Sequence, residues 1–375
     1  MITTLAIAGY RSLRELRIGL GRLTVITGGN GAGKSNVYRA LRLLVDAAEG
    51  NLGRALAREG GMPSVMWAGE GRPTKPGAGT RLSIGFADEL IAYELRLGLP
   101  SPPPPRPPPP FSLDPEVKEE TIRTLASPIT KLLERRGLSV MLRDDEGRPQ
   151  TFGAQLDIDE SVLSQLAEPH RYPVLSVLRE RLRRWRFYHQ IRTDPDSPLR
   201  AVQVGSRTPV LAHDGHDLAP ALQTILDNGN DNALNAAVAD AFDGARLAIG
   251  YEQGRFRLTL QASGVWRPLD AAELSDGTLR YLALLAALHS PRPPELLVLN
   301  EPETSLHPRV LAPLARQIVA AAARSQVIVV SHAAPLVDAI ASSKDAIRVE
   351  LVKEEGETVV ANRKRLDEPA WKWTS

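Results

Sequence analysis

The sequence Gly28-Gly29-Asn30-Gly31-Ala32-Gly33-Lys34-Ser35 decides the fold of this chain. It matches the pattern G-x-x-x-x-G-K-S, in which backbone N–H groups of a glycine-rich loop wrap a phosphate and the next helix points its positive end at it. The apolar run 23–27 precedes the loop and predicts a strand. Apolar residues after the loop recur at helical spacing, at Val37, Ala40, Leu41, Leu44 and Val45. Strand, loop and helix therefore follow in the order that a phosphate site requires.

The residue types of the loop suit a nucleoside triphosphate with its magnesium ion. Lys34 is predicted to contact the β- and γ-phosphates, and the Ser35 hydroxyl is predicted to ligate Mg²⁺. Glycine serves where the backbone must approach the phosphates closely. The loop residues that we expect to bind ATP are Gly28, Asn30, Gly31, Ala32, Gly33, Lys34, Ser35 and Asn36.

The composition excludes several classes of protein. The chain has 46 basic and 44 acidic residues, a net charge of +2 and no cysteine. The charge balance argues against a globally basic nucleic-acid binder, and the lack of cysteine excludes disulfides, zinc–thiolate sites and thiol nucleophiles. The longest apolar run, 281–288, is too short to span a bilayer, and no basic residue precedes the apolar N-terminal stretch. We expect a cytoplasmic protein with no membrane partner.

The chain organisation predicts an α/β fold. From Leu274 onward, helices alternate with apolar strands, which implies parallel strands covered by helices and sharing a sheet with the phosphate loop. We expect a mixed-sheet lobe and a second, mostly helical lobe. The predicted parts are an N-terminal lobe with the phosphate loop, a proline-rich loop, an inserted helical and β lobe, and a C-terminal half, at residues 1–100, 101–112, 113–270 and 271–375.

Local patterns predict several elements inside these parts. Alternating residues indicate hairpins, at 81–99, 247–260 and 347–361. Apolar spacing indicates helices, at 174–185, 217–227 and 232–242. The proline-rich segment predicts an exposed polyproline II stretch, either a stiff spacer or a docking site for a partner with an aromatic groove.

A buried strand ends in two polar residues. The apolar run 296–299 leads directly into Asn300 and Glu301, at the strand edge where α/β sheets bind ligands. Glu301 is placed to orient or deprotonate the water that attacks the γ-phosphate. Asn300 stands on the magnesium side, where its amide oxygen could accept from a metal-bound water. A carboxylate there would add a negative charge, so the amide should weaken metal affinity and could slow turnover.

A second anion site is predicted at the start of another helix. Ser275, Asp276 and Gly277 precede the helical run 279–289, and a helix N-terminus attracts anions. One chain that holds one triphosphate has no evident need of two such sites, so this one is expected on the γ-phosphate of a neighbouring copy. An ordinary N-cap role for Ser275 is the alternative.

A third strand delivers a histidine to the same edge. The run 327–330 is apolar and leads into Ser331 and His332. His332 is expected to sense the γ-phosphate, with a purely structural histidine as the alternative.

Together these motifs resemble the Walker A, signature, Walker B and switch-histidine motifs of ABC-type ATPases, in the same order. The segments 7–13 and 300–308 look like the RecF, SMC and overcoming-lysogenization-defect group of AAA family ATPases. The resemblance implies a head-to-tail homodimer with each ATP between the Walker A loop of one subunit and Ser275 to Gly277 of the other. It also implies that Arg11 binds ATP, that Ser305 and His307 line the interface and that a glutamine contacts the metal.

The resemblance comes with departures. Asn300 replaces the usual aspartate, which puts the rate of hydrolysis in question, and Asp276 replaces the second residue of the more familiar signature. Gln190 is the candidate for the glutamine of the metal site. The predicted set is therefore Lys34, Glu301 and His332 for catalysis and Ser35, Asn300 and Gln190 for magnesium.

The leading functional hypothesis is an ATPase that dimerises around ATP and drives a DNA-associated or anti-phage defence process, with any nuclease or effector on a separate chain. The alternatives are a nucleotide-gated binding module with little hydrolysis and the ATP-binding subunit of a transporter. DNA binding would rest on a cluster of arginines, for which a solvated helix face is the alternative. The cluster is Arg179, Arg181, Arg183, Arg184 and Arg186.

Overall fold

The computed structural model describes residues 1–67, 69, 81–100, 110–144, 147–152, 156–166, 168–362 and 368–374. The chain divides into two compact units. Unit 1 comprises Met1–Gly21, Gly28–Trp185 and Val349–Ser375, and unit 2 comprises Arg22–Thr27 and Arg186–Arg348. These units divide the chain differently from the four ranges predicted above. Most of the predicted proline-rich loop, residues 101–109, lies outside the described residues.

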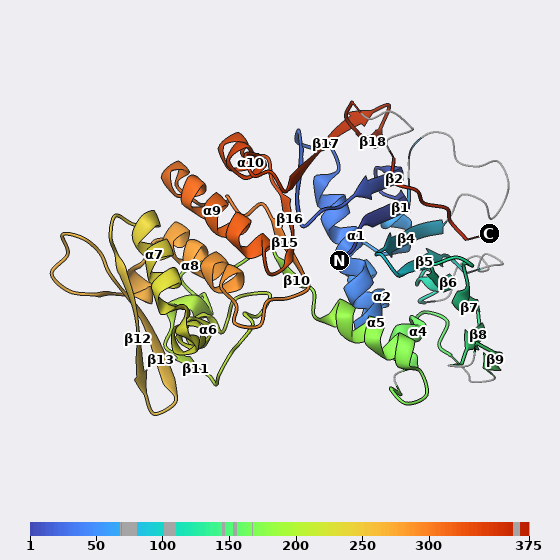
Figure 1. Ribbon diagram of the computed structural model, residues 1–375, viewed down its shortest axis with the longest axis horizontal. Coiled ribbons are helices and arrows are strands. Elements are labelled where there is room, and N and C mark those ends of the chain that lie inside the picture. The colour runs from blue at the N-terminus through green and yellow to red at the C-terminus, as the bar shows by residue number, and fades with distance from the viewer. Residues whose placement is uncertain are drawn as a thin grey trace. The chain divides into compact units, whose positions relative to one another are not determined.

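Unit 1 is built on an antiparallel sheet (Figure 1), whose described strands run in the order β2-β1-β4-β5-β6-β7-β8-β9. The strands are β1 (Thr4–Tyr10), β2 (Leu13–Gly19), β4 (Arg81–Ala87), β5 (Ile91–Gly98), β6 (Glu116–Thr124), β7 (Lys131–Arg136), β8 (Ser139–Arg143) and β9 (Pro149–Phe152). Arg81 pairs with Gly98, which confirms the first predicted hairpin. Because β5 pairs with β6, the sheet continues across the proline-rich segment.

The helices of unit 1 bury apolar stripes. They are α1 (Lys34–Glu49), α2 (Leu52–Arg58), α3 (Met62–Val65), α4 (Val162–Gln165) and α5 (Pro173–Arg183). The helical spacing after the phosphate loop is confirmed, since Val37, Leu41 and Leu44 on α1 are fully buried. Helix α1 contacts α5 and β1, so the helix that follows the loop is anchored along its length.

The last described residues also belong to unit 1. Strands β17 (Ala346–Glu354) and β18 (Glu357–Val360) form the predicted C-terminal hairpin, with Leu351 paired to Val360. Beyond it, Trp371 is only 4% exposed and packs on alanines of the antiparallel sheet. Gly85 is needed there, because a Cβ at this position would lie 2.4 Å from the Trp371 ring.

Unit 2 contains four parallel strands in the order β10-β15-β16-β3. They are β3 (Leu23–Gly28), β10 (Arg186–Tyr188), β15 (Leu296–Asn300) and β16 (Gln326–Val330). Every residue of β15 and β16 is buried, as in strands covered on both faces. The pairing of β3 with β16 confirms that the strand before the phosphate loop shares a sheet with the C-terminal half.

Unit 2 also contains helices and a second sheet. The helices are α6 (Leu218–Ile225), α7 (Asp231–Ala241), α8 (Asp276–Leu288), α9 (Leu311–Ala322) and α10 (Ala334–Ala341), with shorter helical turns η1 (Pro198–Arg200), η2 (Leu226–Asn230), η3 (Ala271–Glu273) and η4 (Pro308–Val310). A second, antiparallel sheet contains β11 (Gln203–Val204), β12 (Arg246–Glu252), β13 (Arg255–Gln261) and β14 (Leu269–Asp270). The predicted helix pair and the predicted hairpin in this region are confirmed.

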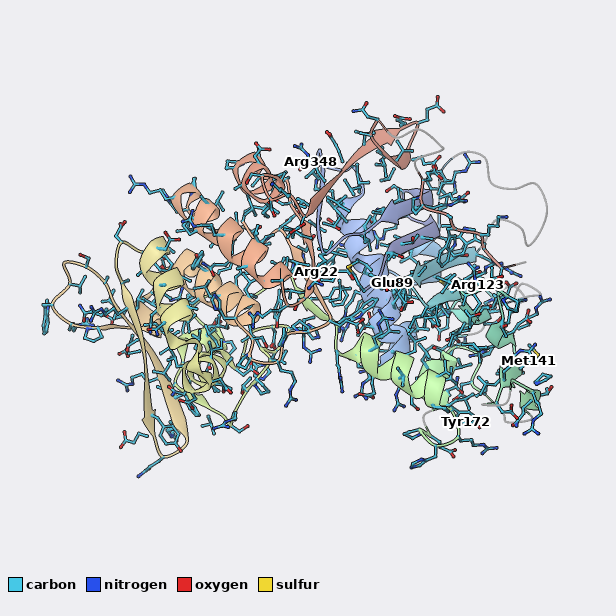
Figure 2. The ribbon with its side chains drawn as sticks, viewed as in Figure 1. Arg22, Glu89, Arg123, Met141, Tyr172 and Arg348 are labelled. Atoms are coloured by element: carbon cyan, nitrogen blue, oxygen red, sulfur yellow. The ribbon has the colours of Figure 1, made fainter. Side chains whose placement is uncertain are left out.

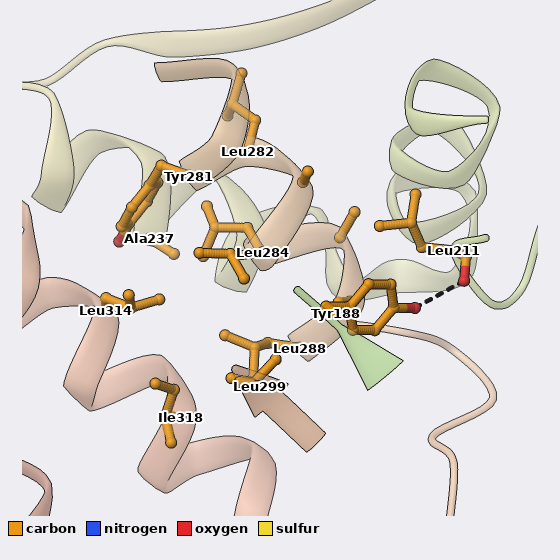
Figure 3. Close-up of a cluster of buried hydrophobic side chains, with 14 of the residues drawn as sticks. Tyr188, Leu211, Ala237, Tyr281, Leu282, Leu284, Leu288, Leu299, Leu314 and Ile318 are labelled. Atoms are coloured by element: carbon orange, nitrogen blue, oxygen red, sulfur yellow. Dashed lines mark hydrogen bonds between the residues drawn. The ribbon is translucent and has the colours of Figure 1, made fainter. Parts of the chain in front are cut away.

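The core of unit 2 joins the helices to β15 (Figure 3). Leu288 of α8, Leu299 of β15 and Ile318 of α9 are buried in one cluster, and each such side chain contributes about 1.5–3 kcal/mol by leaving water. At the edge of this cluster, Tyr188 donates to the Leu211 carbonyl at 2.7 Å. Arg22, labelled in Figure 2, closes the start of β3 by donating to the carbonyls of Ala322 and Ala323. The carboxyl ends of the strands are therefore held by a packed core.

Candidate functional site

The phosphate loop leads into a helix whose N-terminus has no side-chain cap. Gly33 takes the cap position in a left-handed conformation with φ 95°, and it makes no side-chain cap hydrogen bond to the first turn of α1. A Cβ on Gly29 or Gly31 would meet nothing within 4 Å, so both glycines border open space. Open glycine backbone beside an uncapped helix N-terminus is the arrangement that holds phosphate oxygens. The loop therefore fits ATP.

Lys34 lies against its own loop. It is 6% exposed, and its Nζ donates to the carbonyl oxygens of Gly28 at 2.7 Å and Gly29 at 2.9 Å. The ammonium group is thus held beside Gly29, one of the two glycines that border the open space. A phosphate in the loop would offer it a charged acceptor in place of neutral carbonyls.

The back of the loop is braced by the C-terminal hairpin. Thr358 of β18 is fully buried, and its hydroxyl lies 2.7 Å from Ser12 Oγ, which also accepts from Asn36 Nδ2. A Cβ on Gly33 would lie 2.2 Å from Thr358 Oγ1, and one on Gly28 would lie 2.3 Å from the Leu351 carbonyl. Residues more than 300 positions apart therefore fix the path of the loop.

Arg11, predicted to bind ATP, has a carboxylate partner in this structure. Its Nη2 donates to Glu59 Oε2 at 2.8 Å, and Tyr10 donates to the same oxygen at 2.6 Å. Burial and this contact with Glu59 raise the pKa of Tyr10, so the phenol stays protonated and donates. An ATP role for Arg11 stays a prediction.

Unit 2 brings the other predicted catalytic residues to one sheet edge. In the register of the parallel strands, Asn300 faces Val330, and Val330 faces Ile26. Asn300 with Glu301 and Ser331 with His332 therefore leave neighbouring strands at the edge where β3 runs into the phosphate loop. Glu301 has a φ of 49°, a sparsely populated conformation for a non-glycine residue, and its N–H donates to the Val330 carbonyl. Such strain concentrates at functional sites.

Glu303 organises the histidine segment and was missed by the sequence analysis. It is 9% exposed, and its Oε1 accepts from Ser331 Oγ at 2.7 Å and from the His332 N–H at 3.0 Å. The His332 side chain is half-exposed, with Nδ1 3.3 Å from the same oxygen. The signal that could have found Glu303 is its position two residues after Glu301, on the same turn.

Asn300 is almost completely buried, at 2% exposure. Its Nδ2 lies 2.7 Å from His189 Nδ1, while its Oδ1 is buried and has no hydrogen-bond partner among the described residues. A buried acceptor without a partner calls for a water or a ligand, and an oxygen donor suits magnesium or its bound water. The Asn300 Oδ1 thus fits a metal ion or its bound water, and a metal role for Ser35 stays a prediction.

His189 and Gln190 follow β10 at the same edge. Tyr188 pairs with Leu299, so the residues that follow them, His189 and Asn300, are neighbours. Gln190 is exposed one position further on, and its metal role stays a prediction. No group of three or more histidine or acidic residues suited to a metal ion occurs in the described part of the chain.

The serine-led helix end is part of unit 2. Ser275 caps α8 by accepting from the Thr278 N–H at 3.2 Å, which is the ordinary role weighed above. Arg200 Nη2 donates to Asp276 at 2.5 Å, and its Nη1 donates to the Leu274 carbonyl at 2.7 Å. Ser275 and Asp276 remain exposed, so the cap role leaves the expected contact with a second copy open.

The predicted interface loop touches this helix end directly. A Cβ on Gly277 would lie 2.6 Å from the Ser305 carbonyl, so only glycine fits there. Ser305 and His307 are both exposed, and His307 Nδ1 accepts from the Arg309 N–H. An interface role for Ser305 and His307 stays a prediction.

The predicted arginine cluster is not a uniform basic face. Arg181 donates to Asp88, and Arg183 donates to Glu180 at 3.1 Å. Arg179 is mostly buried, with Nε 3.6 Å from the Glu180 carboxylate. Arg179, Arg181 and Arg183 therefore each have an acidic neighbour within unit 1.

The sequence has a family match over most of its length. Residues 23–338 match the family described as "AAA domain, putative AbiEii toxin, Type IV TA system". The chain belongs to this AAA family. The match runs from the strand before the phosphate loop to beyond His332, so every motif named above except the segment around Arg11 lies inside it. No curated protein matches the chain.

Solved structures agree with the family on the fold. An SMC head bound to the C-terminal winged-helix domain of ScpA is 14% identical, with 96% of this chain and 97% of that chain covered and a TM-score of 0.51. The SMC head with an extended coiled coil, bound to the C-terminal domain of ScpA from Pyrococcus furiosus, is 13% identical, with 96% and 95% covered and a TM-score of 0.50. These likenesses show the predicted fold class, an ABC-ATPase head of the P-loop NTPase type.

This member of the AAA family is thus an ABC-type P-loop ATPase, as the motifs predicted. Among its described residues, no helix is both long enough and apolar enough to cross a bilayer.

Proposed function

We propose that this ATPase binds ATP with Mg²⁺, forms a head-to-tail homodimer around two nucleotides and hydrolyses them to drive a partner process. The observation that supports nucleotide binding most directly is the uncapped N-terminus of α1, which directly follows open glycines and the lysine-bearing loop. Lys34 would exchange its two carbonyl acceptors for phosphate oxygens.

In this proposal the residues at the carboxyl ends of the unit 2 strands have separate roles. Glu301, held at the end of β15, orients the attacking water and accepts its proton. His332 contacts the γ-phosphate, and Glu303 holds the backbone of His332 in position for this contact. Ser35 and Asn300 would hold magnesium, which would neutralise charge on the phosphates. The strain at Glu301 supports a functional role for this carboxylate.

The homodimer rests on the exposed serine-led end of α8. Lys34→Ala should abolish ATP binding, whereas Ser275→Arg should bind ATP and remain monomeric at saturating nucleotide. Light scattering on gel-filtered protein measures the mass, and a fluorescent ATP analogue measures binding. Thr278→Val serves as the control, because it changes a residue at the same helix end and keeps the size of the side chain. ATP-dependent dimers of Ser275→Arg with normal turnover would refute the shared site.

A second candidate is a nucleotide-gated module that barely hydrolyses ATP, favoured by Asn300 in the place of a carboxylate. Steady-state phosphate release separates the two candidates. If the missing charge limits turnover, Asn300→Asp should accelerate it, and an unchanged rate would discard that explanation.

For the partner process we propose anti-phage defence or a DNA-associated task, carried out with a separate nuclease or effector protein in the cytoplasm. The family's description as a putative toxin of a type IV toxin–antitoxin system supports defence. The SMC heads that share the fold were solved with a bound ScpA domain, which supports a protein partner. The requirement for ATP supports the cytoplasm. A transporter role has no comparable support.

To test this proposal, tagged wild type, Glu301→Gln and Lys34→Ala are purified with ATP present. The proteins that co-purify with each of them are then identified. A partner held by the ATP-bound form should be enriched with Glu301→Gln and missing with Lys34→Ala. Equal recovery with both variants would reject ATP-controlled partner binding.

A further inference from the structure

His189 and Asn300 hold each other at the ends of neighbouring strands. β10 and β15 are parallel and in register at Tyr188 and Leu299, so the next residues lie side by side. Asn300 Nδ2 is 2.7 Å from His189 Nδ1. The two residues are 111 positions apart in sequence, and only the sheet brings them together.

The backbone around this pair is fixed by a buried arginine. Arg280 of α8 is 8% exposed, and its Nη2 donates to the His189 carbonyl at 2.8 Å and to the Glu301 carbonyl at 3.2 Å. Burial lowers the pKa of Arg280 against the opposing field of Glu303 and Glu301, yet a guanidinium stays charged in proteins. One cation therefore clamps the strand ends that carry both members of the pair.

The pair decides which atom of the amide points away from the imidazole. An amide offers a donor nitrogen and an acceptor oxygen, and the two can exchange places by rotation about χ2. When Nδ1 of the imidazole accepts, it takes the amide nitrogen, and the oxygen faces the other way. That oxygen is the buried Oδ1 with no partner among the described residues, and a metal or its bound water needs an oxygen there.

We propose that His189 is a positioning residue, whose Nδ1 accepts a hydrogen bond from Asn300 Nδ2 and thereby turns Asn300 Oδ1 toward the cation that accompanies ATP. His189 and Asn300 form a matched acceptor–donor pair. An aspartate at 300 would offer only acceptors, so the imidazole would have to carry its proton on Nδ1. This inference rests on the proposed function for the identity of the cation.

The tautomer itself is testable in metal-free, nucleotide-free protein. ¹⁵N-histidine NMR of the wild type, with His189→Asn to assign the signal, should show Nδ1 without a proton and Nε2 with one. A proton on Nδ1 in the neutral ring would overturn the assignment. This measurement requires no binding of ATP, so it decides the inference even if the proposed function fails.

The consequence for the cation is tested with Mn²⁺ and a non-hydrolysable ATP analogue, by electron paramagnetic resonance. His189→Leu removes the acceptor and should weaken Mn²⁺ binding about tenfold or more, as loss of a supporting hydrogen bond does at other metal sites. His189→Asn places an acceptor oxygen near the former Nδ1 and should restore most of the affinity. Unchanged Mn²⁺ affinity in a folded His189→Leu would overturn the inference.

Two controls separate positioning from general damage. His213→Leu removes another imidazole, one that lies 3.2 Å from the Phe187 N–H of the same strand, and should leave Mn²⁺ affinity unchanged. Affinity for the analogue in EDTA should stay the same in all three variants. If the analogue binds to none of the proteins, including the wild type, the proposed function is refuted and the NMR result alone decides the role of His189.

Discussion

Glu303 Oε1 accepts a hydrogen bond from Ser331 Oγ at 2.7 Å, and this contact ties the segment after β15 to the segment after β16. The same oxygen accepts from the N–H groups of His332 and Ala333. Glu303 itself does not need to touch the nucleotide, because its task is to hold the backbone on which the switch histidine sits.

Glu303→Ala should therefore lower kcat for ATP with little change in KM. The variant leaves buried donors unsatisfied, which costs about 1–3 kcal/mol each, so the free energy of unfolding should fall too. Glu303→Gln keeps an acceptor oxygen, so its kcat and its free energy of unfolding should lie between those of the wild type and of Glu303→Ala. Phosphate release and urea unfolding measure the two effects. A Glu303→Ala enzyme with normal kcat would show that His332 needs no such support.

Gly33→Ala should destroy nucleotide binding. The φ of 95° is strained for any side chain, and the new Cβ would lie 2.2 Å from Thr358 Oγ1. We expect a loss of about 1–3 kcal/mol from the free energy of unfolding together with the loss of ATP affinity. Gly29→Ala is the matched control, since its Cβ meets nothing within 4 Å and should leave unfolding unchanged. Equal unfolding energies for the two variants would count against the Thr358 brace.

Glu301→Gln should bind ATP and accumulate as a dimer. The amide keeps the shape of the side chain and cannot accept the proton of the attacking water, so turnover should fall about 10²–10⁴-fold. Light scattering with ATP and Mg²⁺ measures the dimer, and the wild type with ADP serves as the monomeric control. A Glu301→Gln protein that turns over at the wild-type rate would remove this carboxylate from the mechanism.

Asp46→Asn should stabilise the protein above neutral pH. Burial raises the pKa of Asp46 in α1 to about 6, from an ordinary value of 3.8. The folded state therefore binds this proton more tightly than the unfolded state, so stability falls as the pH rises from about 4 to about 6. At pH 8 the asparagine variant should gain up to about 3 kcal/mol, and at pH 3.5 it should equal the wild type. Urea unfolding at both values measures the difference, and a gain of equal size at both would rule out the charge as its cause.

Much of the fold was predictable because its signals are local. The apolar run 296–299 and the glycine loop after 23–27 identify strands by their own composition, and burial on both faces leaves few other choices. The hairpins at 81–99 and 247–260 follow from alternation around short polar turns. The order of the four motifs then led to the ABC-type family.

The sequence by itself predicted a phosphate-binding loop and several of the strands and helices, and it determined which family the chain belongs to. Only the tertiary structure decided that Thr358 braces Gly33, that Glu59 holds Arg11, that Glu303 anchors Ser331 and that His189 faces Asn300. Spacing along a chain reports the local backbone state, whereas the neighbours of a side chain depend on strand order and register. Those are set by the burial of a whole core, to which residues hundreds of positions apart contribute together.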